Sequence, residues 1–434
     1  MTALARRLDT KTDAFQVDFA RNSAQLPGAG LTWLDMKRRA AMDAFAKTGV
    51  PTRRLESWKY TDLANAIESE LTPAPSFRGE IREQTPFQHS GPELLLAGGF
   101  LHRTVRDDGI EIFDLARLGA ETPDWVTANF GKMASGAEQP LGAASLALMR
   151  GGVAICVRNS ATLRLSFVNP PLGYPLVSHA RILLVVESGV SLRLLESHTG
   201  RGSDETLRNI GVELVLKPQA KLEHVRLQAE PSTTLHITSI GAWLEHKAEY
   251  RALYAAVGAR LSRLDVNVRL AEPDTHVTLH NVTAINSGIA DITTVMDHAS
   301  PHTTSRQLFK SVVGGRGRAV SQGRVVVRQG AIKSDSHQLF KAVLLSSRAE
   351  ADAKPELEIF ADDVVCGHGT AIGALDADAL FYLRARGIPE KEAEGLLIHA
   401  FLEEAMTGFA EEEDRTALWR YLDGALASAG QTAT

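Results

Sequence analysis

Cysteine is scarce in this sequence, with only Cys156 and Cys366 among 434 residues. Two cysteines are too few to staple a chain of this length, and such usage is typical of a reducing compartment in which thiols stay free. No apolar h-region or small-residue cleavage site follows Arg6 and Arg7. The sequence therefore predicts a cytoplasmic protein without a secretory signal.

Long apolar runs and concentrated positive charge are also missing. The run from Ile182 to Val186 is far too short to span a bilayer, so we expect no membrane association. A formal net charge of -5 gives no electrostatic reason to expect nucleic acid. The segment from Gly314 to Arg318 is not a GxGxxG loop, because Val320 stands where the last glycine is needed. With no GxxxxGK[ST] motif either, we expect the chain to bind no nucleotide.

Catalytic constellations are not evident. Asp362 and Asp363 are consecutive, so on a strand they face opposite ways and cannot form a carboxylate pair. No nucleophile, base and orienting group stand out together. We therefore expect the chain not to be an enzyme.

The periodicity of the apolar residues changes along the chain. Residues 1 to about 70 read as helical, with Trp33, Met36, Ala40 and Ala44 on one face. From about residue 150 the period becomes two, and strand-like runs punctuated by turn residues continue without an amphipathic helix between them. This argues against a doubly wound α/β sheet and leaves a sandwich, a barrel, a propeller or a solenoid. A solenoid would take roughly 20 to 25 residues per coil, with two strands in each.

The last section is predicted to be helical. Asp376 can cap a helix from Ala377 to Arg386 that stops at Gly387, and Pro389 opens a second helix. A third is expected from Glu411 to Ala427. The predicted division is an N-terminal helical and mixed region over 1–149, a β core over 150–375 and a C-terminal helical region over 376–434.

Cys366 and His368 are the candidate metal-ligating residues. Two residues apart on an extended chain, they point to the same face, so a thiolate and an imidazole could meet one metal or iron–sulfur cluster. Two ligands do not close a tetrahedral site, so the others must come from elsewhere or from another chain. The alternative is that Cys366 is simply a small buried hydrophobe.

The remaining cysteine and the paired histidines have structural interpretations. Cys156 lies in an apolar strand and is expected in the core. His276 and His280 share a strand face, while His298 and His302 bracket a turn. Without a third ligand we expect these to be surface histidines or satisfied core histidines.

Several segments resemble the SufB/SufD family. The resemblance is specific over residues 295–405, looser back to about 150, and returns near Pro51 and Trp58. The absence of a CxxC pair is similar to the SufD branch of that family. The segments that carry it are Thr304-Ser305-Arg306-Gln307-Leu308-Phe309-Lys310, Gly323-Arg324-Val325-Val326-Val327, Lys354-Pro355-Glu356-Leu357-Glu358-Ile359, Cys366-Gly367-His368-Gly369, Phe381-Tyr382-Leu383-Arg384-Ala385-Arg386-Gly387-Ile388 and Trp58-Lys59-Tyr60-Thr61.

The resemblance implies a mainly β fold, a right-handed parallel β-helix flanked by N- and C-terminal helical regions. It implies a non-catalytic scaffold for iron–sulfur cluster assembly that pairs with a SufB-like subunit and supports iron acquisition. The C-terminal helices would dock the SufC ATPase. His368, with Cys366 beside it, would face the partner's cluster-building cysteine, so that a nascent cluster is held transiently by both chains.

Other arrangements stay open from sequence. The chain could homodimerise when alone, or could be a SufB-like subunit that carries the cluster itself. A β-helix polysaccharide lyase is a further alternative. That enzyme would need carboxylates or basic residues grouped on one face, and a secretion signal.

Overall fold

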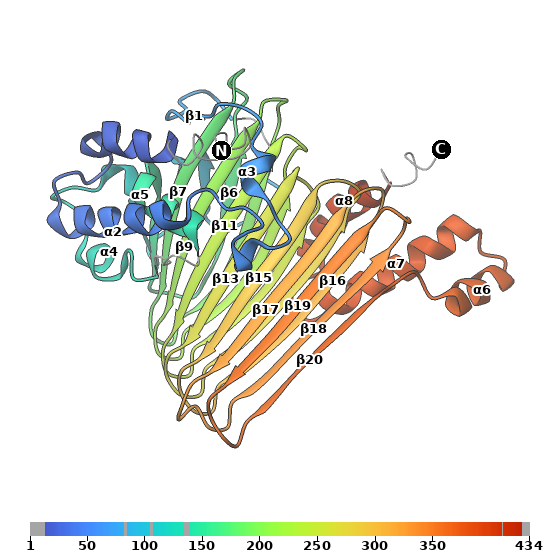
Figure 1. Cartoon of the computed structure of the whole chain (residues 1–434). Coiled ribbons are helices and arrows are strands. Elements are labelled where there is room, and N and C mark those ends of the chain that lie inside the picture. The colour runs from blue at the N-terminus through green and yellow to red at the C-terminus, as the bar shows by residue number, and fades with distance from the viewer. Residues whose placement is uncertain (1–13, 82–84, 105–106, 134–138, 410, 428–434) are drawn as a thin grey trace.

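The computed structural model describes residues 14–81, 85–104, 107–133, 139–409 and 411–427, and shows a β-solenoid with helices at both ends (Figure 1). Residues 1–13, part of the region predicted to be helical, lie outside the described residues. Residues 14–22 are helical. The predicted parallel β-helix with flanking helical regions is confirmed.

The helices and strands follow one another in a simple order. The helices are η1 (Ser23–Gln25), α2 (Thr32–Thr48), η2 (Glu56–Trp58), α3 (Leu63–Ala66), η3 (Leu115–Arg117), α4 (Asp124–Asn129), α5 (Pro140–Leu148), α6 (Ala377–Ala385), α7 (Glu390–Met406) and α8 (Glu412–Ala427). The first strands are β1 (Thr72–Pro73), β2 (Glu93–Ala97), β3 (Phe100–Arg103), β4 (Ile110–Asp114), β5 (Gly151–Val157), β6 (Ala161–Asn169), β7 (Leu176–Val186), β8 (Ser191–Gly200), β9 (Thr206–Leu216) and β10 (Lys221–Ala229). The remaining strands are β11 (Thr234–Leu244), β12 (Glu249–Ala256), β13 (Leu261–Leu270), β14 (His276–Ile285), β15 (Ile289–His298), β16 (Thr304–Val313), β17 (Arg318–Val327), β18 (Asp335–Leu344), β19 (Glu350–Ile359) and β20 (Val365–Gly373).

From β5 onward, successive strands alternate between two parallel sheets. The odd-numbered strands from β5 to β19 form one sheet (sheet A) and the even-numbered strands from β6 to β20 form the other (sheet B). Equivalent positions in neighbouring coils are 28 residues apart at Arg263 and Asp291 and 31 apart at Ser305 and Ser336. The predicted coil of 20 to 25 residues is therefore wrong. Each coil holds two strands of about ten residues and two turns of several residues, and the prediction left too little length for the turns.

The core lies between the two sheets. Val153, Ile155 and Val157 face inward with the leucines and valines of later coils. Cys156 faces outward from the same strand, yet it is fully buried, because the N-terminal helices cover that part of sheet A. Alternation thus supplies an inner core inside the coil and outer cores beneath the terminal helices, one on sheet A under the N-terminal helices and one on sheet B under the C-terminal helices.

Helix α2 belongs to this outer core, but its buried face differs from the predicted one. Met36 of the predicted face is 67% exposed. The buried face consists of Leu34, Arg38, Ala41, Met42 and Phe45. The helical period was right and its phase was wrong, because alanines lie on both sides of this helix and give no phase.

The segment after α2 runs along the outside of sheet A. Trp58 is buried, and the Arg263 guanidinium lies 4.0 Å from its ring centroid. Arg263 also donates to Asp291 (2.6 Å) and to the Ser57 carbonyl oxygen (2.8 Å). These contacts join the N-terminal region to β13 and β15.

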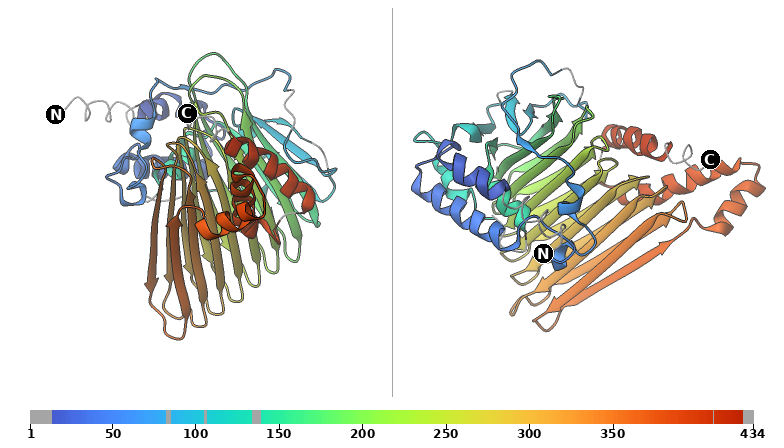
Figure 2. Two further views of the ribbon diagram at one scale, coloured as in Figure 1. Left: turned by 90° about the vertical axis from the view of Figure 1, so that its right-hand side faces the viewer. Right: turned by 45° about the horizontal axis from the view of Figure 1, so that its top comes forward.

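The C-terminal helices lie on the opposite side of the coil, against sheet B (Figure 2). Lys310 of β16 donates to the Phe401 carbonyl oxygen at 2.7 Å, and His280 of β14 lies 2.6 Å from that of Ala405. Asp376 accepts from two amides of α6, as predicted. Pro389 is the residue before α7, one position earlier than predicted.

The two ends of the solenoid differ. At the N-terminal end, β3 and β4 add antiparallel edges to the two sheets and are only four and five residues long. At the C-terminal end, β19 and β20 are nine or ten residues long, and each pairs with one neighbour only among the described strands. The C-terminal coil therefore presents two long open edges (Figure 1).

Candidate functional site

Strand β20 places both predicted ligands at the open end of the coil. Cys366 pairs in register with Ser336 of β18, and His368 pairs with Gln338. Ser336 is fully buried inside the coil. Because parallel neighbours in register lie on the same face, Cys366 and His368 both belong to the inner face, at the mouth of the lumen.

The two positions differ in burial. Cys366 is half-buried and packs against the inner core, whereas His368 is exposed because no further coil covers it. Burial raises the pKa of the Cys366 thiol, and the charge of Asp335 acts in the same direction. The backbone N–H of Ser336 opposes both effects. A metal that binds this sulfur must therefore displace its proton.

A chain of hydroxyl groups lies beneath Cys366. Buried His298 places Nε2 2.9 Å from Ser305 Oγ and Nδ1 2.8 Å from Thr303 Oγ1. Ser305 Oγ in turn lies 2.7 Å from Ser336 Oγ. The column Ser305, Ser336 and Cys366 thus runs along three successive coils, and its polar atoms satisfy one another up to the last position.

The wall opposite is not polar. The inner face of β19 carries Ala351, Ala353 and Leu357, which pack on the core and offer no ligand atom. Within the part of the chain that the structure describes, no three His, Cys, Asp or Glu side chains group together as a metal site. Cys366 and His368 are thus at most two ligands, one soft sulfur and one imidazole, a pair suited to iron in a sulfur-rich cluster.

The other cysteine and histidine interpretations are confirmed. Cys156 is fully buried, and burial raises its pKa to about 11. His298 is a satisfied core histidine, and burial lowers its pKa to about 4. His280 contacts the Ala405 carbonyl oxygen, while His276 and His302 are exposed.

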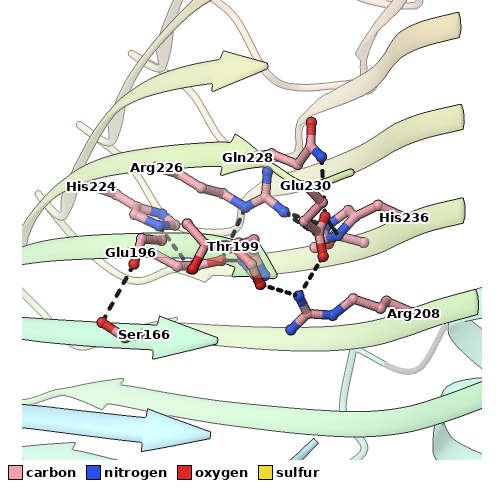
Figure 3. A network of polar contacts seen from close by, with 12 residues as sticks. Ser166, Glu196, Thr199, Arg208, His224, Arg226, Gln228, Glu230 and His236 are labelled. Carbon is pink, nitrogen blue, oxygen red and sulfur yellow. Dashed lines mark hydrogen bonds and ion pairs between the residues drawn. The ribbon is translucent and has the colours of Figure 1, made fainter. Parts of the chain in front are cut away.

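Sequence reasoning missed a charged network inside the early coils (Figure 3). Glu196 accepts from Arg226 Nε (3.0 Å) and lies 3.0 Å from His224 Nε2. Glu230 pairs with Arg208 and lies 2.6 Å from His236 Nδ1. All six side chains are buried. Alternating charged residues within strands were the available signal, but only the register shows that they face one another.

Burial alone would raise the pKa of Glu196 and of Glu230. Neighbouring His198 and His224 hold the pKa of Glu196 well below its ordinary value, and His236 and Arg208 do the same for Glu230. Because the charges are paired in this way, they are tolerated in the interior, and these polar side chains fill the inside of the early coils.

None of the helices among the described residues has the length and apolar character needed to cross a membrane.

Comparison with known proteins matches most of the chain to one protein family. Residues 173–401 match the SufBD core domain of the SUF system for FeS cluster assembly, and residues 10–76 match the SufBD protein N-terminal region. A SufBD family iron–sulfur cluster assembly protein of Synechocystis is 27% identical over 94% of this chain and 95% of its own. The Escherichia coli iron–sulfur cluster assembly protein SufD is 27% identical over 84% of this chain and 87% of its own. The chloroplastic protein ABCI7 of Arabidopsis thaliana is 28% identical, over 90% and 85% respectively.

Proposed function

Because the chain belongs to the SufBD family of the SUF system for iron–sulfur cluster assembly, we propose that it is a SufD-type, non-catalytic scaffold subunit of the cytoplasm. In this role it pairs with a SufB-like subunit and contributes Cys366 and His368 to a half-site at the junction. The nascent cluster is cargo that passes through this half-site.

The observation that carries the proposal is the position of the pair on the last strand of an open coil. Two ligands at a lumen mouth, with an apolar wall opposite, need a second chain to complete the coordination. A long unpaired strand edge is itself a template for strand pairing with another chain.

Exposed apolar side chains on the last coil support the same junction. They are Ile359 (43% exposed), Phe360 (63%), Val365 (61%) and Ile372 (42%). Large apolar side chains gathered at one surface typically mark a protein interaction site. The open edges would supply main-chain hydrogen bonds, and these side chains would supply buried apolar area.

Docking of the SufC ATPase is supported by α6. This helix has no buried residue, and it exposes Phe381 (73%) and Tyr382 (57%). In Figure 1 it projects beyond β20, away from the coil. An exposed aromatic pair on a projecting helix suits insertion into a partner's groove.

In the proposed mechanism, the ATPase binds one arrangement of the two scaffold chains better than another and so shifts the population toward it. The shift would open or reshape the half-site. Cys366 would hold iron as a thiolate, and exposed His368 would add an imidazole from the same face. This would also serve iron acquisition by the complex.

The test replaces His368 by alanine in the complex co-expressed with its SufB-like and SufC subunits. We expect iron and sulfide content to fall roughly tenfold or more while the subunits still co-purify, because loss of even an outer-shell partner typically costs about tenfold or more in metal affinity, and His368 is proposed as a direct ligand. The control is His337→Ala on the adjacent strand, whose side chain is 51% exposed and faces outward. Wild-type cluster content in His368→Ala would contradict the proposal.

A further inference from the structure

Two polar columns run inside the last three coils, and each ends at one of the site residues. The first is Ser305, Ser336 and Cys366, and the second is Gln307, Gln338 and His368. The serine column is internally hydrogen-bonded, as described above. The glutamine column is not.

The amide oxygen of Gln307 is anchored, because Thr294 Oγ1 donates to it at 2.7 Å. The side chain is only 4% exposed, and its Nε2 atom is enclosed and has no acceptor among the described residues. The side chain of Gln338, one strand nearer the mouth, is half-buried, and its Nε2 atom is likewise enclosed and without an acceptor among the described residues. An enclosed donor without an acceptor costs about 1–3 kcal/mol, so such a donor usually faces a ligand or water.

The opposite sheet is shaped to receive Gln338. A Cβ atom at Gly323 of β17 would come within 2.2 Å of Gln338 Oε1. A small lumen cavity is lined by Gln307, Gly323 and Gln338, and it reaches Pro355 of β19 and Thr370 of β20. The amide group of Gln338 thus borders a space that extends into the last coil.

We propose that Gln338 is a further binding residue of the half-site, whose amide N–H donates a hydrogen bond to an anionic sulfur of the nascent cluster. This inference rests on the proposed function, because it needs a cluster bound at Cys366 and His368. Its register beside His368 places Gln338 about one strand spacing, ~4.8 Å, beneath that ligand. Hydrogen bonds to sulfur are a main influence on the potential of such clusters. Gln307 lies one coil deeper at the same position of the register.

The experiment compares Gln338→Met, which keeps the side-chain length and removes the donor, with wild type and with His337→Ala. Each variant is purified as the full complex and loaded with Fe²⁺ and sulfide under reducing conditions. We expect Gln338→Met to form the complex and a cluster. Its midpoint potential should become more negative, because the lost hydrogen bond stabilised the reduced, more anionic state. We also expect iron loss to a chelator to accelerate about tenfold, the lower end of the range for losing an outer-shell partner.

A second variant guards against misfolding of the first. Gly323→Ala keeps the amide group of Gln338 but displaces it, so the potential should shift in the same direction. Potentials and chelator rates equal to wild type in both variants, with the cluster still lost in His368→Ala, would overturn the role of Gln338 and leave the half-site standing. Retention of the cluster in His368→Ala would instead overturn the proposed function.

Discussion

At the scale of single residues, burial decides which charges this protein keeps. His179 and His298 are buried, and burial lowers the pKa of each to about 4. His179 faces Phe15 and Asn209, while His298 faces Thr303 and Ser305. None of these partners carries a negative charge that would stabilise the protonated imidazole by direct contact. Both histidines are therefore neutral in the folded protein at physiological pH.

This gives a prediction for acid stability. An unfolded histidine binds a proton below about pH 6.5, whereas folded His298 binds one only near pH 4, so stability falls as the pH drops through that window. One such histidine costs about 2 kcal/mol at pH 5 relative to pH 7.5. We expect His298→Gln to lose less stability between these values than wild type, measured as the shift of the urea midpoint. His276→Gln, on the surface, should keep the wild-type difference, and an unchanged difference in His298→Gln would contradict the assignment.

The residue-level predictions succeeded where strand alternation was enough. The settings of Cys156 and His298 could be predicted because they depend only on nearby apolar or hydroxyl side chains. The network around Glu196 and Arg226 needed a coil length, because its members come from different strands. The position of Gln338 beneath His368 could likewise not be predicted without the register of the strands.

At the scale of elements, the terminal helices show what local signals can and cannot settle. The cap at Asp376 was predictable because a short acidic side chain before a helix satisfies free amides. The buried face of α2 was not, because its alanines fit either side. The absence of a buried side chain in α6 was equally hidden from sequence, since a pair such as Phe381 and Tyr382 would ordinarily be assigned to a core.

Helix α6 carries the prediction at this scale. Replacing Phe381 by glutamate should abolish co-purification of the SufC ATPase, or weaken its binding roughly thirtyfold or more, because a buried aromatic anchor is typically worth about 2 kcal/mol or more. The folded chain should be unaffected, since this side chain packs on little of it. The matched control is Met36→Glu on α2, an apolar side chain of the N-terminal region that is 67% exposed. Binding of both variants is measured by titration calorimetry, and equal SufC affinity in Phe381→Glu and wild type would refute the docking assignment.

At the scale of the whole molecule, the order of strands places Cys366 and His368 on the last strand of the coil. The solenoid was identified through the resemblance, because the strand pattern alone left four architectures. The coil length was predicted wrongly because turns cannot be measured from apolar spacing. That the Cys366 pair falls on the terminal strand and not on an internal one depends on the number of coils, which no local pattern encodes.

The open end of the last coil carries the prediction at this scale. Val365→Glu places a charge on the exposed edge strand, and we expect it to prevent pairing with the SufB-like subunit, because a charge in an apolar interface must be desolvated. The measurement is light scattering on the co-expressed subunits. Tyr174→Glu is the matched control, since Tyr174 is 39% exposed and lies before β7, far from the last coil. A normal heterodimer in Val365→Glu would argue against the open end as the junction.

The unequal ends also limit how far such chains can associate. A stack of coils with two long bare edges could in principle propagate without limit, as cross-β fibres do. Here the short antiparallel strands β3 and β4 stand at the opposite end and offer a second copy little to continue from. Growth can therefore begin at one face only, and contact between two such faces uses up both. A chain with one open end and one closed end therefore favours pairs over polymers.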